Sequence, residues 1–420
     1  HVHGEVQAQM LMGLTGAIVV EGPEHDARRA AGIVERVLVV RQTQDQDAGK
    51  TPAAAMTAAP AGAPAAPGPG PRETIDTSHE LLCTSNAGID QISLDGTPVP
   101  LGDVPDSALA RLEIAPGSRQ YWQLLNAATD AFLSLSVEDE RGRALPLEIA
   151  ARDGSPLTDD AGQRLHPPPT AEAQSVPPGG RIEFFVAAPP PGVKAYLVTH
   201  AVDTGCAGDR LPQRRLAVVI ASGAAAPALP PAVEPAPHAA VPPDLFAGIL
   251  SRQVDRRRVI AMAEYPRPGR ADQTDFYIVE RKRGAVLRPY AMGDAPAITV
   301  KAGTTEEWLI ENWTNELHTF HIHQLHFRVL DVDGRPSPAP ELLDVVEIPY
   351  ASATGLHSAE GPVRPGRVRL RMTFPADMAG DIPFHCHLVD HEDNGMMAVL
   401  RIVKPGASSR PVARAPEAEP

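Results

Sequence analysis

The chain has 420 residues, which is enough for two or three domains that each bury a core of their own. Its 38 Lys and Arg residues stand against 52 Asp and Glu residues, and the formal charge of −14 argues against nucleic acid or an anionic membrane as a partner. No apolar run approaches the roughly 20 residues that a membrane helix needs, so we expect no membrane insertion and small-molecule partners.

Clusters of Pro, Gly and Ala divide the chain into segments. Such runs lack apolar periodicity and are typical of linkers. In chain order, the segments are a leading piece (1–45), a linker (46–74), a middle block (75–221), a second linker (222–244), a final block (245–404) and a flexible tail (405–420). The leading piece is too short to be a domain alone and resembles the end of one.

Short β-branched and aromatic runs, bounded by Gly, Pro, Asp or Asn, predict many strands. In chain order the clearest are GAIVVEG, RVLVVRQ, RIEFFVAA, AYLVTHA, RRLAVVIA, AITVKAG, EEWLIEN, FRVLDVDG and VRLRMTF. Long amphipathic helices are hard to find in the pattern. We therefore expect an all-β protein, with one sandwich in each of the two larger blocks.

The three cysteines are too few for a disulfide scaffold. Cys83 and Cys206 are compatible either with two buried thiols or with a disulfide, which would suit an oxidising compartment. Cys386 differs from both because a histidine lies on each side of it.

Two short segments of the final block concentrate residues that bind metals. They are HTFHIH (318–323) and FHCHLVDHEDNGMM (384–397), and their candidate ligands are His318, His321, His323, His385, Cys386, His387, His391 and Met396. In a strand, alternate side chains point to opposite faces, so the His385 and His387 side chains should leave one face and the Cys386 side chain the other.

The cysteine face has the ligand set of a blue-copper site. A thiolate, two imidazoles and a distant thioether fit such a trigonal centre, and here they are Cys386, His318, His391 and Met396. The opposite face offers only imidazoles, from His321, His323, His385 and His387. Zinc is a weaker interpretation, because it requires neither an axial methionine nor histidines on both sides of the cysteine.

The two segments resemble the two C-terminal copper-binding signatures of the multicopper oxidases, in particular the laccase-like enzymes with three cupredoxin domains. In addition, ISLDGTPVP, IAARDGSPL and VPPGGRIEFFV resemble the second cupredoxin domain, and EEWLIENWTNELHTFHIHQLHF resembles the third. The resemblance implies tandem cupredoxin-like Greek-key β-sandwiches or barrels. The first is expected to be incomplete, with residues 1–45 as its C-terminal remnant.

The opening HVH stands before QMLMGLTGAIVV, which resembles the context of the second of the family's four paired-histidine motifs. The resemblance implies that the type 1 copper is bound by His318, Cys386, His391 and Met396, the type 2 copper by His321, and the type 3 coppers by His1, His3, His323, His385 and His387. The family's first motif has no counterpart in this sequence. We therefore expect an N-terminally truncated chain from an enzyme that holds four coppers when complete.

The resemblance also implies a reaction. Organic donors such as phenols or aromatic amines would lose electrons one at a time at the type 1 copper, and O2 would be reduced to water at a trinuclear cluster. Glu392 resembles the carboxylate that delivers protons to that cluster; a solvated loop residue is an equal interpretation, and Asp393 has a weaker claim. The family implies a periplasmic or secreted protein.

Two other functions stay open. One is an oxidase of cuprous or other metal ions, although such a function would be favoured by a Met-rich insertion and the nine methionines are not clustered that way. The other is a copper-binding electron-transfer fragment without oxidase activity, because the first paired-histidine motif is absent.

Overall fold

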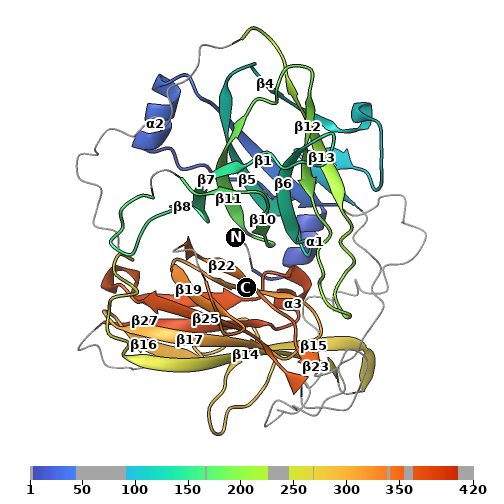
Figure 1. Ribbon diagram of the computed structural model, residues 1–420. Coiled ribbons are helices and arrows are strands. Elements are labelled where there is room, and N and C mark those ends of the chain that lie inside the picture. Colours follow the sequence, from blue (N-terminus) through green and yellow to red (C-terminus); the bar gives the residue numbers. More distant parts are fainter. Residues whose placement is uncertain are drawn as a thin grey trace, which may run out of the picture.

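The computed structural model describes residues 3–43, 91–165, 168–225, 246–267, 269–337, 341–353 and 363–404. The predicted linker 46–74, the tail 405–420 and most of the linker 222–244 lie outside these ranges. The described part consists mostly of strands arranged in two stacked blocks (Figure 1). The predicted all-β fold is confirmed.

The middle block is a sandwich of two sheets. Its strands are β1 (Val34–Gln42), β2 (Ile92–Leu94), β3 (Thr97–Val99), β4 (Ala110–Ile114), β5 (Arg119–Ala127), β6 (Leu133–Asp139), β7 (Leu147–Arg152), β8 (Ser155–Pro156), β9 (Thr170–Ala171), β10 (Gln174–Val176), β11 (Arg181–Ala187), β12 (Lys194–Thr199) and β13 (Arg214–Ala221), with a 3-10 turn at Asp106–Ala108. One sheet runs β3-β2-β1-β5-β11-β7-β8, with β9 beside β7, and the other runs β10-β6-β12-β13-β4. Alternating burial along β11 puts Ile182, Phe184 and Val186 in the core.

The C-terminal block is a second sandwich. Its strands are β14 (Arg256–Arg267), β15 (Arg270–Glu280), β16 (Ile298–Lys301), β17 (Thr305–Asn312), β18 (His318–Ile322), β19 (Phe327–Val332), β20 (Arg335–Pro336), β21 (Leu342–Leu343), β22 (Val345–Ile348), β23 (Ser352–Ala353), β24 (Val363–Arg364), β25 (Gly366–Thr373), β26 (Gly380–His385) and β27 (Met397–Val403), with a 3-10 turn at Ala376–Met378. One sheet runs β15-β14-β17-β25-β19-β20, with β21 beside β19, and the other runs β16-β27-β26-β18-β22. β23 pairs only with β24 among the described strands.

The two sandwiches repeat one topology. In the middle block β1 is parallel to β5, which is antiparallel to β11, just as β14 is parallel to β17 and β17 is antiparallel to β25. In the second sheets, β6-β12-β13-β4 corresponds to β18-β26-β27-β16. Of the two sandwiches, only the C-terminal one carries candidate metal ligands; His3 lies in the leading piece, outside both.

Strand β1 is therefore the counterpart of β14, and it belongs to the middle sandwich. Its pairing with β5 runs from Val34 opposite Gln120 to Arg41 opposite Ala127. This differs from the predicted division, which assigned all of 1–45 to a preceding domain. Local sequence could not reveal the difference, because the pairing joins residues far apart in the chain.

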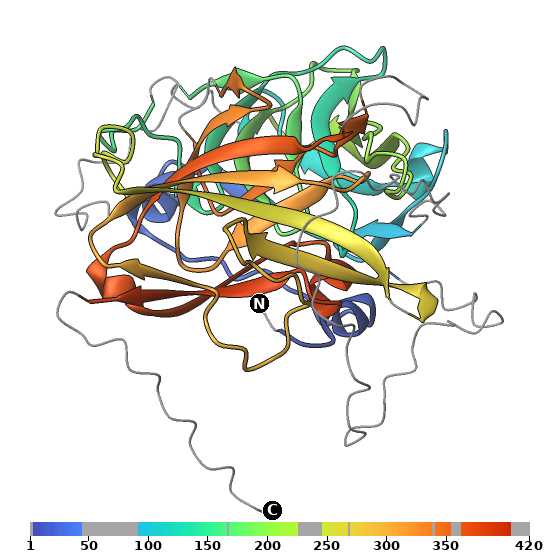
Figure 2. The same ribbon diagram turned by 90° about the horizontal axis from the view of Figure 1, so that it is seen from below.

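The rest of the leading piece contacts both blocks: residues 6 and 7 bind Asp393 of the C-terminal block, whereas Arg28 packs on the Tyr121 ring of the middle block. It holds two helices, α1 (Val6–Leu11) and α2 (Pro23–Ala30), and Figures 1 and 2 both show the blue α1 beside the red α3 (Val389–Asp393). The run GAIVVEG, predicted as a strand, is not one: Ile18 is 95% exposed, and no strand of the described chain pairs with this run.

Each core is built around one tryptophan. Trp122 of β5 and Trp308 of β17 are fully buried on equivalent strands. Each indole Nε1 donates a hydrogen bond of 2.9 Å to the side chain two residues earlier, Gln120 in the first case and Glu306 in the second. This pairing satisfies the indole N–H inside an apolar core.

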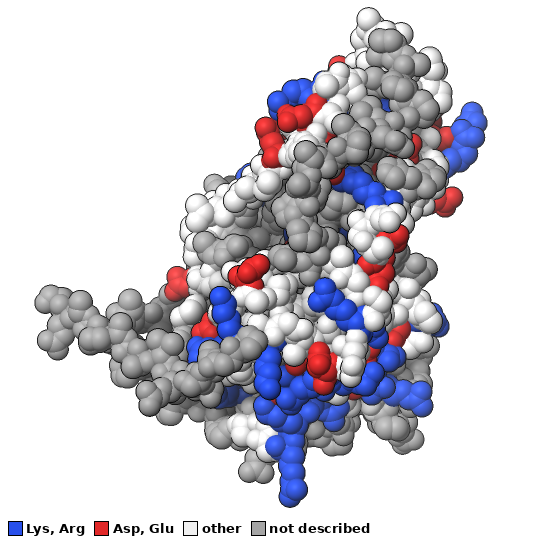
Figure 3. All heavy atoms as spheres, turned by 90° about the vertical axis from the view of Figure 1, so that its left-hand side faces the viewer, with Lys and Arg blue, Asp and Glu red and all other residues white. Residues whose placement is uncertain are grey.

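Lys and Arg side chains gather in the lower part of Figure 3, which the C-terminal block forms. In the C-terminal block, Arg257 of β14 binds Glu307 of β17 at 2.8 Å, and Arg367 of β25 binds Glu311 of β17 at 3.0 Å. No described helix is long and apolar enough to cross a membrane.

Candidate metal centre

The two histidine-rich segments lie side by side because β18 and β26 are antiparallel neighbours. His321 is opposite His385, and Ile322 is opposite Phe384. Phe320 and Phe384 pack against the buried Trp308, which anchors both strands in the core. Residues more than sixty positions apart in the sequence therefore meet at one end of this sheet.

Cys386, His318 and His391 form one compact buried group. The Cys386 Sγ lies 3.5 Å from His318 Nδ1 and 3.9 Å from His391 Nδ1, and the two Nδ1 atoms are 3.1 Å apart. The three side chains are almost completely excluded from solvent. Three soft or borderline donors thus converge on one point, as a blue-copper site requires.

The outer nitrogens of these imidazoles are held by hydrogen bonds. The His318 Nε2 is 2.8 Å from Thr314 Oγ1, and the His391 Nε2 is 2.9 Å from Glu316 Oε1. These contacts turn both Nδ1 atoms toward the sulfur, which is the orienting role that partners of ligating histidines play in metal sites.

The surroundings of Cys386 favour its thiolate form. Burial opposes ionisation, but the charge of His318 and hydrogen bonds with His318 and His391 outweigh it and lower the pKa of the thiol to about 6. Met396 is also fully buried, and its carbonyl oxygen accepts the Cys386 N–H at 3.0 Å. The four predicted type 1 ligands therefore lie within one buried region.

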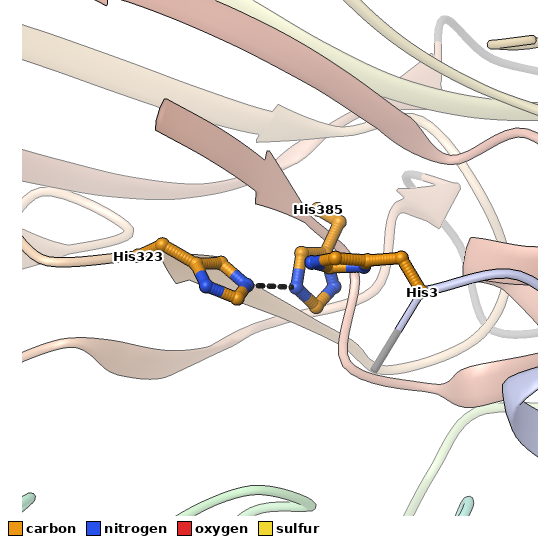
Figure 4. Close-up of side chains that lie close together, drawn as sticks. All are labelled: His3, His323 and His385. Carbon is orange, nitrogen blue, oxygen red and sulfur yellow. Dashed lines mark hydrogen bonds between the residues drawn. The ribbon is translucent and has the colours of Figure 1, made fainter. Parts of the chain in front are cut away.

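Five imidazoles form a second group, referred to below as the histidine cluster: His3, His321, His323, His385 and His387. Ligand nitrogens of His3, His323 and His385 lie within 4.8 Å of one another, and Figure 4 shows these three rings meeting. The His323 and His385 Nε2 atoms are 3.1 Å apart. The ring centroid of His321 is 4.8 Å from that of His323 and 5.3 Å from that of His387.

The cluster rings are suited to hold a metal ion. Burial and neighbouring imidazoles lower the pKa of His323 and of His387, which keeps both rings neutral near pH 7. A neutral imidazole has a nitrogen lone pair to donate. His385 and His387 project into this cluster and Cys386 projects away from it, as strand alternation predicts.

Glu392 connects the leading piece to this cluster. Its carboxylate lies 2.6 Å from His3 Nδ1 and 3.1 Å from His385 Nδ1. Burial opposes ionisation of Glu392, but these two contacts outweigh it and hold the pKa of the carboxyl well below its usual range. The next residue, Asp393, accepts the main-chain N–H groups of Val6 and Gln7 at 3.0 and 2.9 Å.

The predicted histidine and cysteine ligands of the described chain thus fall into two groups, and His1 lies outside the described residues. Of the cysteines left open by the sequence, Cys206 is disulfide-bonded and Cys83 lies outside the described residues. Sequence reasoning missed Thr314, Glu316, Arg181 and Asp344. Thr314 and Glu316 stand just before the motif HTFHIH, which is their only signal in the sequence. Arg181 and Asp344 have no such signal.

Comparisons with known proteins agree with this geometry. Residues 269–406 match the family model of the multicopper oxidases. A laccase from Haloferax volcanii is 30% identical over 159 residues, which cover 34% of this chain and 25% of that protein. A multicopper oxidase from Staphylococcus aureus is 32% identical over 114 residues, which cover 25% of this chain and 22% of that protein. The matched region thus spans about a quarter of each curated relative.

Solved structures share the fold over nearly all of the chain. McoA, a multicopper oxidase from Aquifex aeolicus, matches with a TM-score of 0.60 and 16% identity, over 96% of this chain and 74% of that one. A multicopper oxidase from Campylobacter jejuni, described as a metallo-oxidase, matches with a TM-score of 0.58 and 17% identity, over 96% and 70%. Residues 269–406 thus match the multicopper oxidase family, and the chain shares its fold with solved members of that family.

Copper is the cofactor that this family implies, and the residues present fit it. The donor atoms of the Cys386 group show this fit. They are a thiol with a lowered pKa and two imidazole Nδ1 atoms, all buried and close enough to bind one ion. Such a soft set suits copper, whereas the hard cations Mg²⁺ and Ca²⁺ require oxygen ligands.

Proposed function

We propose that this chain carries the working parts of an oxidase that couples one-electron oxidation of a small organic donor, such as a phenol or aromatic amine, to reduction of O2 to water. The observation that carries the proposal is the pair of centres joined by the tripeptide His385–Cys386–His387. When bound, copper would take up single electrons at the Cys386 centre and deliver four to O2 at the histidine cluster.

The residues have separate tasks in this proposal. Cys386, His318, His391 and Met396 hold the type 1 copper, His321 holds the type 2 copper, and His1, His3, His323, His385 and His387 hold the type 3 coppers. Cys386 is joined through the main chain to a cluster ligand on each side, so it offers the shortest covalent route between the centres. The buried sulfur and its hydrogen-bonded imidazoles keep water away from the first centre.

The disulfide at Cys206 supports the proposal of a periplasmic or secreted protein, because disulfides persist in oxidising compartments.

The proposed reaction is tested by loading the chain with copper. Copper per chain, blue absorption and oxygen uptake with a phenolic donor are then measured. Blue absorption without oxygen uptake would limit the chain to copper binding and electron transfer.

Glu392→Gln tests the proposed route for protons. The Glu392 carboxylate contacts two histidines of the cluster, His3 and His385, so the substitution should slow oxygen reduction by roughly a hundredfold or more, as loss of a proton-transfer group does, and leave the blue absorption unchanged. Rapid-mixing measurements of cluster reoxidation provide the readout. Asp381→Asn, at an exposed carboxylate that pairs with Arg401, is the control and should behave as the parent. Equal loss of oxygen reduction and of blue colour would assign Glu392 a structural role instead.

A second candidate donor is a metal cation, and one observation favours it. Glu264 and Glu316 offer carboxylate oxygens within 4.8 Å of each other and of a His318 nitrogen. Burial and the charge of Glu316 raise the pKa of Glu264 to about 8, which shows that the two carboxyl groups repel each other when both are ionised. Because Glu316 also contacts His391, a cation here would sit beside the Cys386 centre. The metallo-oxidase with the same fold agrees with this candidate.

Glu264→Gln separates the two donors. If ferrous or cuprous ions bind at this pair, the substitution should raise the KM for the ion by roughly tenfold or more and leave phenol oxidation unchanged. Steady-state oxygen uptake with each donor is the measurement. Asp381→Asn, an exposed carboxylate on β26 that pairs with Arg401, is the control. An unchanged KM for metal ions would favour the organic donor.

A further inference from the structure

A turn of the middle sandwich touches the histidine cluster. The turn joins β10 to β11 and contains Gly179, whose φ of +78° is a conformation that other residues rarely adopt. A Cβ at Gly179 would lie 2.3 Å from the His387 Nε2 and 2.4 Å from its Cδ2. The main chain of Gly179 therefore forms a wall against the His387 ring, and no side chain fits between them.

Arg181, the first residue of β11 after this turn, is connected through Asp344 to a second cluster ligand, His321. The Nη1 and Nη2 atoms of Arg181 donate to the two carboxylate oxygens of Asp344 at 2.8 and 2.7 Å. The main-chain carbonyl of Asp344 in turn accepts a hydrogen bond from His321 Nδ1 at 2.8 Å. This bond places the proton on Nδ1, so the lone pair lies on Nε2.

Asp153 completes the contact between the blocks. It lies in the turn between β7 and β8 and is 4% exposed, and one carboxylate oxygen accepts the Arg181 main-chain N–H at 3.0 Å. Its other carboxylate oxygen lies 3.3 Å from the Asp344 N–H, and its carbonyl accepts Arg181 Nη2 at 2.9 Å. A single guanidinium thus sits between two buried acidic residues, one from each sandwich. Such planar, bidentate pairing fixes direction as well as distance.

The Cys386 centre contacts the middle block through other loops. Thr204 accepts the Leu317 N–H at 2.7 Å, and Thr129 accepts the Val389 N–H at 3.2 Å. No residue from 179 to 181 takes part in these contacts. Changes in the turn should therefore act on the histidine cluster and not on the Cys386 centre.

We propose that Gly179 and Arg181 are positioning residues of the histidine cluster, and that docking of the middle sandwich sets the ring orientations of His387 and His321. This inference rests on the proposed function only in taking the cluster to bind copper. Copper affinity at the cluster then depends on a turn that contributes no ligand.

The test is a copper titration of the full chain, read by two signals from one sample. Blue absorption reports the Cys386 centre, and the electron paramagnetic resonance signal of the remaining cupric ions, with total copper, reports the cluster. Arg181→Gln and Gly179→Ala should weaken cluster copper binding roughly ten- to a hundredfold, as the loss of partners of metal ligands does, and should change that resonance spectrum. Blue absorption should stay at the parent level.

Two further variants sharpen the result. Arg181→Lys keeps the charge but loses the two-pronged bond, so its affinity should fall between those of the parent and of Arg181→Gln. Arg119→Gln is the matched control, because Arg119 forms an ion pair of 2.9 Å with Glu148 at the opposite end of the β5–β11 pairing. It should behave as the parent.

The outcomes are distinct. Parent-level copper affinity and spectrum in both Arg181→Gln and Gly179→Ala would overturn the positioning role and leave the proposed function standing. Blue absorption that falls in parallel with cluster copper would also overturn it, because it would show a general loss of structure. A parent chain that binds copper only at the Cys386 centre would overturn both proposals.

Discussion

Replacing Cys386 with serine is expected to abolish the blue absorption of the copper-loaded chain completely. The colour of such centres depends on a thiolate ligand, and Cys386 supplies the thiol of the buried group, with Sγ 3.5 Å from His318 Nδ1. Its lowered pKa, about 6, makes the thiolate the main form at neutral pH. A serine hydroxyl stays protonated there and is a poor copper ligand.

The visible spectrum and the copper content should be measured together for this variant. The histidine cluster does not use the sulfur, so Cys386→Ser should retain copper bound at the cluster. Met397→Leu, a buried neighbour of the fourth predicted ligand Met396, is the control and should remain blue. A blue Cys386→Ser variant would refute the assignment of Cys386 to the type 1 site.

Trp308→Ala should lower the free energy of unfolding of the C-terminal block by about 3–5 kcal/mol, the range for removal of a large aromatic side chain from a core. Trp308 has no exposed surface, and its ring centroid is 5.6 Å from that of Phe384 and 6.3 Å from that of Phe320. These two phenylalanines lie on the strands that carry the ligands. The cavity would therefore also loosen β18 and β26 beneath both centres.

Chemical unfolding of the copper-free chain, followed by circular dichroism and intrinsic fluorescence, measures this effect. Trp313→Ala is the matched control, since Trp313 follows the same strand but is only half-buried, with its indole 3.1 Å from Glu311. Its loss should be clearly smaller. Equal losses for the two variants, or a loss below about 1 kcal/mol for Trp308→Ala, would contradict the central place given to Trp308.

Local sequence was informative wherever the determining interactions are local. Alternation along 384–387 predicts opposite directions for Cys386 and its flanking histidines, because successive side chains of a strand point to opposite faces. The β-branched runs likewise predict the class of fold, since these residues favour extended backbone. The run GAIVVEG shows the limit of this reasoning: a strand needs a partner, and in the described chain this run has none.

The sequence by itself determined the all-β class, the two sandwiches and the ligand-rich segments, because each is encoded in residues close together in the chain. Only the tertiary structure decided which block β1 joins and how the middle sandwich reaches the cluster. Arg181 and Asp344 are 163 positions apart, and Gly179 meets His387 across the boundary between the blocks. No local pattern marks such pairs, because the packing of one sandwich against the other creates their contacts.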